Sequence, residues 1–148
     1  MYNLLGSNIF AFDIVGKIFK FTNSELKNTQ IPHYHICIYR ENNVAYLVCC
    51  TSDRNGNRKR LAQIKGTLAS LIHIIPDNEN NFTIDTYVDC NYIFKFSIEE
   101  LKKLIDQNEN FYTGSCVNDI IIQKLYNGLL AHDDIVEEDK DILRTLIV

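Results

Sequence analysis

The sequence predicts an α+β fold in which a small antiparallel β-barrel is followed by helices. Residues 16–96 contain short runs rich in β-branched and aromatic residues, separated by polar turns. From residue 97 onward the apolar residues adopt a helical spacing instead. Helices do not alternate with the strands, which argues against a parallel doubly wound sheet. We therefore expect a single domain over residues 1–148, mainly a β-barrel in 16–96 and mainly helical in 97–148.

Five segments have the composition of strands. They are residues 16–21, 33–39, 44–50, 70–75 and 86–96. The turn Glu41-Asn42-Asn43 joins the second and third of them as a hairpin. Along the fifth, period-two alternation predicts that Thr86, Val88, Cys90, Tyr92, Phe94 and Phe96 face the core. Residues 22–31 are polar and predict a loop, as does the Asn55-Gly56 pair, which favours positive φ.

Three helices are expected after the strands. Ser97 and Glu100 have the spacing of a capping box at the start of the first helix. A second helix is expected from about Val117 to Tyr126, ending near Gly128, and a third over residues 135–147. Acidic residues gather near the start of the third helix, where the helix dipole favours negative charge.

Length and composition exclude several classes of protein. A chain of 148 residues suits one domain, and 46% hydrophobic with 23% charged residues is ordinary globular composition. No apolar run approaches the ~20 residues of a membrane-spanning helix. The amino terminus lacks the pattern of a secretory signal, so we expect a cytoplasmic protein with no membrane partner. The five cysteines are odd in number and lack CxxC spacing, which indicates buried structural thiols.

The formal net charge of −4 hides an uneven distribution. Residues 133–148 hold six acids and two bases, whereas residues 53–65 hold five bases and one acid. The five bases are Arg54, Arg58, Lys59, Arg60 and Lys65. This basic segment is a candidate site for a phosphate-bearing partner. The acidic segment either stabilises its own helix through the helix dipole or competes with that partner for the basic segment.

His33 and His35 are two residues apart on an expected strand, so both side chains project to the same face. Ile36 and Ile38 take the opposite face. Paired imidazoles can act as general acid and base, or as metal ligands in a cupin-like enzyme. The spacing to Glu41 does not fit the cupin motif, and we expect no metal and no other cofactor.

Thr51 and Ser52 end the third expected strand, immediately before the basic segment. Hydroxyl groups at a strand end, followed by arginines, can hold a phosphate. In a simple hairpin with its turn at residues 41–43, Thr51 and Ser52 return opposite His33 and His35. We therefore predict that His33, His35, Thr51, Ser52 and the five bases form one site, which can hold a phosphate-bearing ligand.

Three stretches of the chain resemble the MazF/PemK-like toxin superfamily, whose members have an SH3-like barrel. They are Gly16–Phe21, Pro32–Ile38 followed by Val44–Ser52, and Asp85–Ile93 running through Phe96-Ser97 to Glu100-Leu101. Together they cover about residues 16–105. Thr51-Ser52, followed by basic residues and extra helices, resembles the ToxN-like branch. The family usually has an arginine before the strand-leading proline, and this chain has Ile31 there.

The resemblance implies a growth-inhibiting endoribonuclease toxin of a toxin–antitoxin or phage-defence module. It implies metal-independent cleavage of single-stranded RNA, with Thr51 and Ser52 on the scissile phosphate. We predict that the catalytic residues are His33, His35, Thr51 and Ser52. The RNA-binding residues are then Arg54, Arg58, Lys59, Arg60 and Lys65. A protein or RNA antitoxin would be its partner, and a homodimer is one oligomeric state left open. Tyr34, Tyr39 or Tyr87 could stack on bases. The alternative is a non-catalytic RNA- or protein-binding module on the same barrel.

Overall fold

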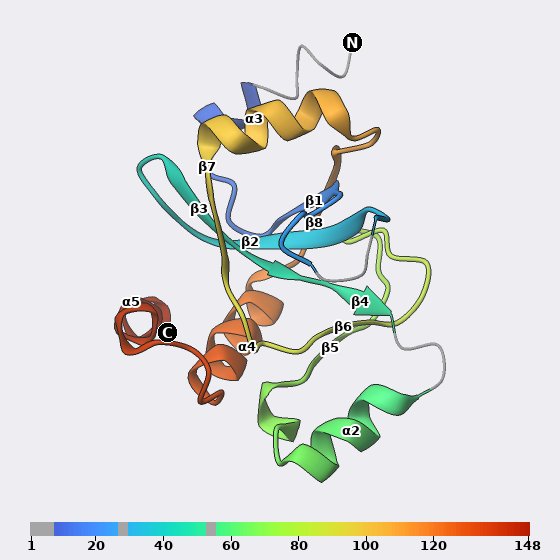
Figure 1. Cartoon of the computed structure of the whole chain (residues 1–148), viewed down its shortest axis with the longest axis vertical. Coiled ribbons are helices and arrows are strands. Elements are labelled where there is room, and N and C mark those ends of the chain that lie inside the picture. The colour runs from blue at the N-terminus through green and yellow to red at the C-terminus, as the bar shows by residue number, and fades with distance from the viewer. Residues whose placement is uncertain (1–7, 27–29, 53–55) are drawn as a thin grey trace.

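Two antiparallel sheets form the centre of the protein (Figure 1). The computed structural model describes residues 8–26, 30–52 and 56–148. The larger sheet has the strand order β7-β3-β2-β1-β8, and the smaller sheet has the order β4-β6-β5. The strands are β1 (Lys17–Phe21), β2 (His33–Glu41), β3 (Val44–Cys49), β4 (Thr51–Ser52), β5 (Ile72–Ile74), β6 (Thr86–Val88), β7 (Phe94–Ser97) and β8 (Tyr112–Cys116).

Four α-helices lie around the sheets in the described part of the chain, so the α+β class is confirmed. They are α2 (Asn57–Lys65), α3 (Ile98–Gln107), α4 (Asp119–Leu130) and α5 (Glu137–Leu146). Two short 3₁₀ helices, η1 (Asn8–Ala11) and η2 (Leu68–Ser70), complete the elements. As expected, α3 starts with a capping box: Ser97 accepts from the backbone of Glu100, whose side chain accepts from the backbone of Ser97.

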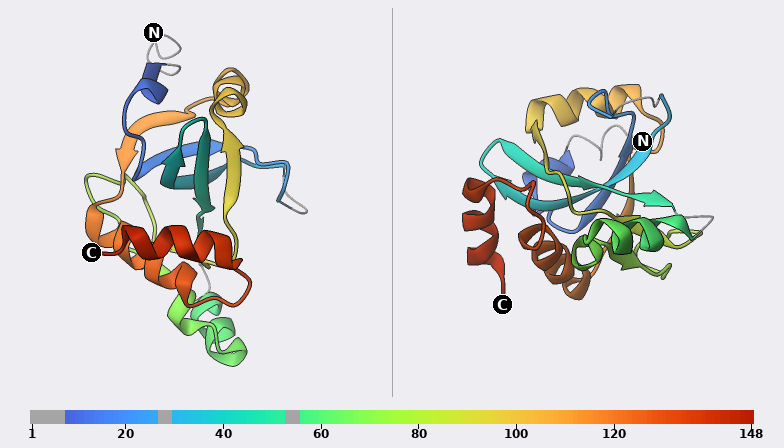
Figure 2. Two further views of the ribbon diagram at one scale, coloured as in Figure 1. Left: turned by 90° about the vertical axis from the view of Figure 1, so that its left-hand side faces the viewer. Right: turned by 60° about the horizontal axis from the view of Figure 1, so that its bottom comes forward.

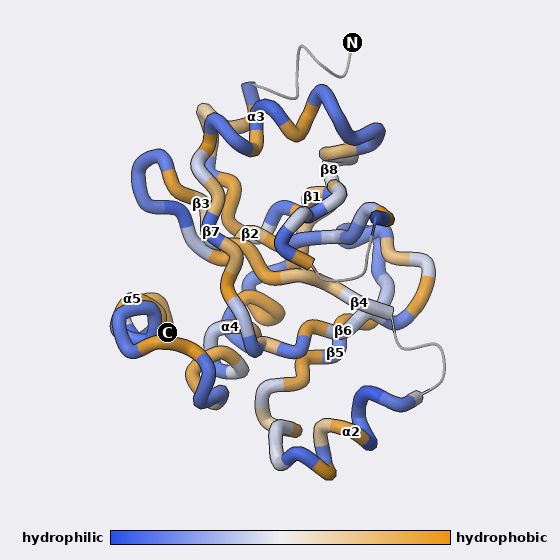
Figure 3. Tube along the Cα trace, viewed as in Figure 1, coloured by the Kyte–Doolittle hydropathy of each residue, from blue (hydrophilic) through white to orange (hydrophobic). Residues whose placement is uncertain are grey.

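The larger sheet separates two hydrophobic cores (Figure 3). On one face, Cys37 of β2 packs with residues of α3 and η1. On the other face, Ile36 and Ile38 pack with residues of α4 and of the smaller sheet. The alternation of β2 explains this division, because successive side chains point to opposite faces. Figure 2 shows α5 lying against α4, on the side of the sheet away from α3.

The expected closed barrel is wrong, because the described strands divide between two open sheets. β3 and β4 follow one another along the chain, but β4 leaves the larger sheet and pairs with β6. The expected strand 86–96 is also divided: β6 belongs to the smaller sheet, whereas β7 pairs with β3. Cys90 has a φ of 50° between these two strands, which breaks the extended backbone. Tyr92 consequently lies at the surface instead of in the core.

Other elements also differ from the sequence-based expectation. The basic segment was expected to be a loop, but Asn57–Lys65 form α2; Gly56, with a φ of 68°, precedes the helix. α4 continues through Gly128 to Leu130. A Cβ on Gly128 would lie 3.0 Å from Cys90 Sγ and 3.1 Å from Ile72, so glycine permits close packing there instead of ending the helix. β8 was not expected.

Candidate functional site

The hairpin of β2 and β3 brings His33 and Thr51 to the same end of the larger sheet. Cys49 pairs with His35, and Val48 pairs with Ile36. The backbone N–H of Cys50 donates to the carbonyl of Tyr34, over 2.8 Å. Continuing this register places Thr51 across from His33, whereas Cys49 takes the position expected for Ser52 opposite His35. The predicted juxtaposition therefore holds for His33 with Thr51 and is wrong for His35 with Ser52.

Two adjacent hollows meet at His33 and Thr51, which line both of them. Hollow A has a volume of about 320 Å³, and its wall includes Lys20, Tyr34 and Ser52. Hollow B also has a volume of about 320 Å³ and is lined in part by Arg58, Asp89, Asn91 and Tyr92. His33 and Thr51 thus form a ridge between two cavities, which we call the His33–Thr51 ridge. A group bound on the ridge is accessible from both sides.

Arg58 connects α2 to the ridge. Its Nη2 donates to Thr51 Oγ1 over 2.9 Å, and its Nη1 forms an ion pair with Asp89. Thr51 Oγ1 also makes a long contact of 3.5 Å as donor to the carbonyl of Ser52. The threonine hydroxyl therefore has a cation beside it and a proton that it can redirect to an incoming oxygen. The Asp89 carboxylate pairs with the other side of the same guanidinium.

The imidazole of His33 has a defined orientation. Its Nδ1 lies 3.1 Å from the carbonyl oxygen of Ile31. Because a carbonyl only accepts, Nδ1 carries the hydrogen, and Nε2 is left with its lone pair in the neutral ring. No described residue forms a hydrogen bond to this Nε2. His33 therefore presents a proton acceptor at the ridge.

His35, by contrast, lies in the core and does not line hollow A or B. Its ring stacks on Phe21 with centroids 4.1 Å apart. Its Nδ1 donates to the carbonyl of His33 over 2.9 Å, and Asn23 Nδ2 donates to its Nε2 over 3.2 Å. Burial lowers the pKa of His35 to about 4, because desolvation disfavours the imidazolium. His35 here supports the end of β2, and its predicted catalytic role stays a prediction.

The predicted RNA-binding bases lie at different distances from the ridge. Arg58 lines hollow B and also a third cavity, hollow C, of about 480 Å³. Lys65 lines hollow C, which shares Arg58, Asp89 and Asn91 with hollow B. Lys59 and Arg60 are exposed on α2 and line none of the three hollows. Arg54 lies outside the described residues.

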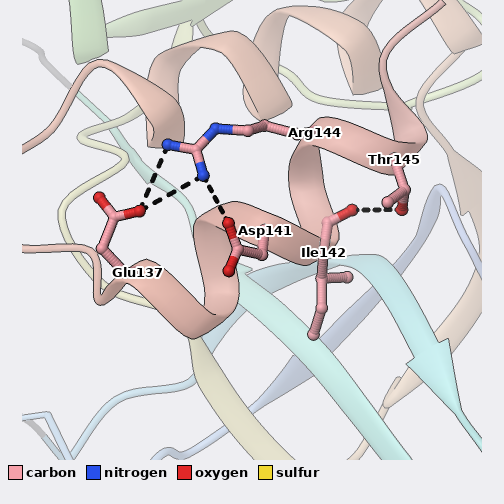
Figure 4. Close-up of polar contacts among 5 residues, drawn as sticks. All are labelled: Glu137, Asp141, Ile142, Arg144 and Thr145. Carbon is pink, nitrogen blue, oxygen red and sulfur yellow. Dashed lines mark hydrogen bonds and ion pairs between the residues drawn. The ribbon is translucent and has the colours of Figure 1, made fainter.

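The acidic carboxyl-terminal segment reaches the same surface. Asp133 and Asp134 line hollow C together with Arg58 and Lys65, so negative and positive groups share that cavity. Two acids of α5 form ion pairs within the helix itself. Arg144 bonds Asp141 over 2.6 Å and Glu137 over 3.3 Å (Figure 4). The expectation that acidic residues compete with a bound partner stays a prediction, and Asp133 and Asp134 are the residues placed to do so.

A third acid of α5 anchors the helix to the larger sheet. Asp139 accepts from Lys95 Nζ of β7 over 2.8 Å, and only 8% of Asp139 is exposed. This hydrogen bond raises the pKa of Lys95. The ammonium of Lys95 also lies 5.2 Å from the ring centre of Tyr46 on β3. α5 is thus held by a half-buried ion pair, apart from the three hollows.

The five cysteines are free thiols that form no disulfide, and Cys37, Cys50 and Cys90 are buried. Burial raises the pKa of Cys37 to about 12 and that of Cys49 to about 11. It also raises the pKa values of Cys50 and Cys90. Because the thiolate is the nucleophile, these four thiols are poorly suited to covalent catalysis at neutral pH.

Sequence reasoning missed several residues of the hollows. Of the three candidate stacking tyrosines, Tyr34 lines hollow A, while Tyr39 packs edge-on against Tyr46 and Tyr87 stacks on His73. Tyr92 was assigned to the core by alternation along 86–96, but it lines hollow B. Asp89 lies between Val88 and Cys90, which the alternation assigned to the core, so the same pattern implies an outward position for Asp89. Nothing in the local sequence paired it with Arg58.

Two comparisons with known proteins bear on this chain. No model of a protein family matches the chain, and no curated protein matches it in sequence. Within the described ranges, no three His, Cys, Asp or Glu side chains come together as a set of metal ligands. No helix in the part of the chain that the structure describes is long and apolar enough to cross a membrane. The site must be interpreted from its own geometry.

Proposed function

We propose that the chain is a growth-inhibiting endoribonuclease of a toxin–antitoxin or phage-defence module. It acts in the cytoplasm and cuts single-stranded RNA without a metal ion. We place it with the MazF/PemK-like toxins, on the sequence resemblance over about residues 16–105. The observation that carries this proposal is the His33–Thr51 ridge, where an imidazole, a hydroxyl and the Arg58 guanidinium meet between two hollows.

Each polar group at the His33–Thr51 ridge has a role in the cleavage of RNA. His33 Nε2 takes the proton of the ribose 2′-hydroxyl, whose oxygen attacks the adjacent phosphorus. Thr51 and Ser52 donate hydrogen bonds to the phosphate, and Arg58 stabilises the charge of the phosphorane. The bond to the 5′-oxygen breaks, and that oxygen takes a proton from water. The products are a 2′,3′-cyclic phosphate and a 5′-hydroxyl.

The series of hollows supports an extended ligand. Hollow A shares the ridge with hollow B, and hollow B shares Arg58, Asp89 and Asn91 with hollow C. Each cavity is in the size range of small-molecule sites, and neighbouring cavities share lining residues. A single strand with unstacked bases fits such a surface better than a rigid duplex does.

Two assays test this function together. Purified protein is incubated with mixed cellular RNA in EDTA, and growth is followed after induction in a bacterial host. We expect RNA fragments with cyclic phosphate ends and arrested growth. Intact RNA combined with normal growth would contradict the proposal. A cognate antitoxin, protein or RNA, is expected from a gene beside this one, and co-expression of that gene should restore growth.

A second candidate is a non-catalytic module that binds RNA or a protein through its charge. Lys59 and Arg60 favour it, because both are exposed on α2 away from the His33–Thr51 ridge. This function predicts binding that weakens with added salt but leaves RNA uncut. Replacing His33 with alanine would then leave the effect in cells unchanged, which separates the two candidates.

A further inference from the structure

Two exposed tyrosines lie on opposite sides of the His33–Thr51 ridge. Among the phenylalanine and tyrosine side chains of the described residues, only Phe12, Tyr34 and Tyr92 are exposed. Tyr34 lines hollow A, and Tyr92 lines hollow B. Two of these three exposed rings therefore occupy the two cavities that meet at the ridge. Aromatic rings in polar cavities are a common means of holding flat ligands.

Each ring is fixed by packing but keeps accessible surface. Tyr34 is 38% exposed and packs edge-on against the buried Phe82, with ring centres 5.3 Å apart. Tyr92 is 53% exposed and packs on the buried Phe94, with ring centres 4.6 Å apart. A rigid ring loses little conformational entropy when a ligand stacks on it. Both tyrosines are thus prepared for stacking before a ligand arrives.

Each hollow also combines its aromatic ring with a cation. In hollow A, the ammonium of Lys20 lies 5.2 Å from the ring centre of Tyr34. In hollow B, Arg58 accompanies Tyr92. A ring together with a cation suits a nucleotide, whose base stacks while its phosphate is neutralised. The same combination occurs twice, once on each side of the ridge.

We propose that Tyr34 and Tyr92 form two base-stacking subsites, which hold the nucleobases on either side of the phosphate bound at the His33–Thr51 ridge. The ligand class is single-stranded RNA, because bases within a duplex are stacked on one another and cannot reach the two rings. This inference rests on the proposed function, since it takes the ridge as the phosphate site. To the proposed function it adds where the two bases that flank this phosphate lie.

The test uses a ligand that the protein cannot cut. The probes are 2′-O-methyl tetranucleotides with 2-aminopurine at the second or the third position and mixed bases elsewhere. Stacking quenches 2-aminopurine fluorescence, so quenching reports each subsite separately. The variants are Tyr34→Leu, Tyr92→Leu, Tyr34→Phe and Tyr92→Phe. Phe12→Leu is the matched control, since Phe12 is 70% exposed and lines none of the three hollows.

We expect wild-type protein to quench both probes. Each leucine variant should lose quenching at one position, a different one for each tyrosine, and bind roughly tenfold more weakly. The phenylalanine variants keep a ring and should behave like wild type, as should Phe12→Leu. The inference is overturned if both leucine variants quench like wild type, or if wild type quenches neither probe.

The outcome separates this inference from the proposed function. Because the probes lack a free 2′-hydroxyl, quenching does not depend on cleavage. If wild-type protein cuts RNA but quenches neither probe, the nuclease function stands and the proposal of two stacking subsites is overturned. Wild type that quenches both probes with the expected variant pattern, yet leaves RNA intact, supports the subsites and contradicts the nuclease.

Discussion

Arg58 Nη2 donates a 2.9 Å hydrogen bond to Thr51 Oγ1, while Nη1 of the same guanidinium pairs with Asp89. An incoming phosphate would compete with the Asp89 carboxylate for Arg58, because both are anionic acceptors. Both members of the ion pair are partly exposed, so exchanging one anion for another is energetically inexpensive. The relationship makes Asp89 a restraint on ligand binding at the ridge.

We therefore expect opposite effects from substitutions at the two ends of this ion pair. Asp89→Asn should raise the affinity for a single-stranded RNA oligonucleotide several-fold. Arg58→Ala should lower the affinity by a similar factor and make the affinity depend less on salt concentration. The measurement is fluorescence anisotropy over a range of salt concentrations. Arg60→Ala, on the same helix but outside the hollows, is the control and should change the affinity less. Weaker binding by a correctly folded Asp89→Asn would contradict this account.

His35 predicts a pH dependence of stability. Burial lowers the pKa of His35 to about 4, whereas an unfolded histidine titrates near 6.5. Between these values the unfolded chain binds more protons than the folded chain, so stability falls as the pH falls. Going from pH 6.5 to 4, His35 should contribute a loss of about 3 kcal/mol in the free energy of unfolding.

Urea denaturation of wild type and His35→Leu across this range isolates the effect. The wild-type curve should fall more steeply with decreasing pH than that of the variant, although the variant is less stable at pH 7 because Asn23 loses its partner. His33→Ala, which keeps the buried ring, serves as the control and should follow the wild type. Parallel curves for wild type and His35→Leu would show that His35 is not a buried neutral histidine.

Tyr126 predicts a local contribution to stability. Its hydroxyl donates over 2.6 Å to the carbonyl of Ile38, where the register between β2 and β3 shifts. Tyr126→Phe leaves that buried carbonyl without this donor and should cost about 1–2 kcal/mol of unfolding free energy. Chemical denaturation measures this. Tyr92→Phe, at an exposed tyrosine, should change stability by less than about 0.5 kcal/mol; equal effects of the two substitutions would contradict the assignment.

Gly128 offers a test in which packing opposes helix propensity. In a helix interior, alanine is more favourable than glycine by about 1 kcal/mol. At position 128, however, the Cβ of alanine would lie 3.0 Å from Cys90 Sγ. We expect Gly128→Ala to lower the melting temperature, because the crowded contact with Ile72 and Cys90 outweighs the propensity. Asn127→Ala, at the neighbouring exposed position, is the control. Stabilisation by Gly128→Ala would show that this contact relaxes freely.

The fold shows where pattern reasoning succeeds and where it fails. β1 and β2 were predicted closely, because runs rich in β-branched and aromatic residues between polar turns are typical of buried strands. The break at Cys90 was not, since a single positive φ leaves little trace in hydrophobic alternation. Gly128 was misinterpreted because a glycine that permits close packing looks the same in sequence as one that ends a helix.

The candidate site divides in the same way. The approach of His33 and Thr51 followed from hairpin geometry, which depends only on the turn and the register. The burial of His35 did not follow, because equal spacing along a strand says nothing about which neighbours cover each position. Arg58 was included for its charge, but its bonds to Thr51 and Asp89 join segments that the sequence alone does not bring together.

The most direct test of the central claim is cleavage of a labelled single-stranded RNA in EDTA, comparing wild type with His33→Ala. His73→Ala is the matched control, because His73 is exposed but lines none of the three hollows. We predict that wild type and His73→Ala release fragments with 2′,3′-cyclic phosphate ends, identified by mass spectrometry. We also predict that folded His33→Ala is slower by about 10²–10⁴-fold. RNA that stays intact with wild type, or a His33→Ala rate equal to wild type, would contradict the claim.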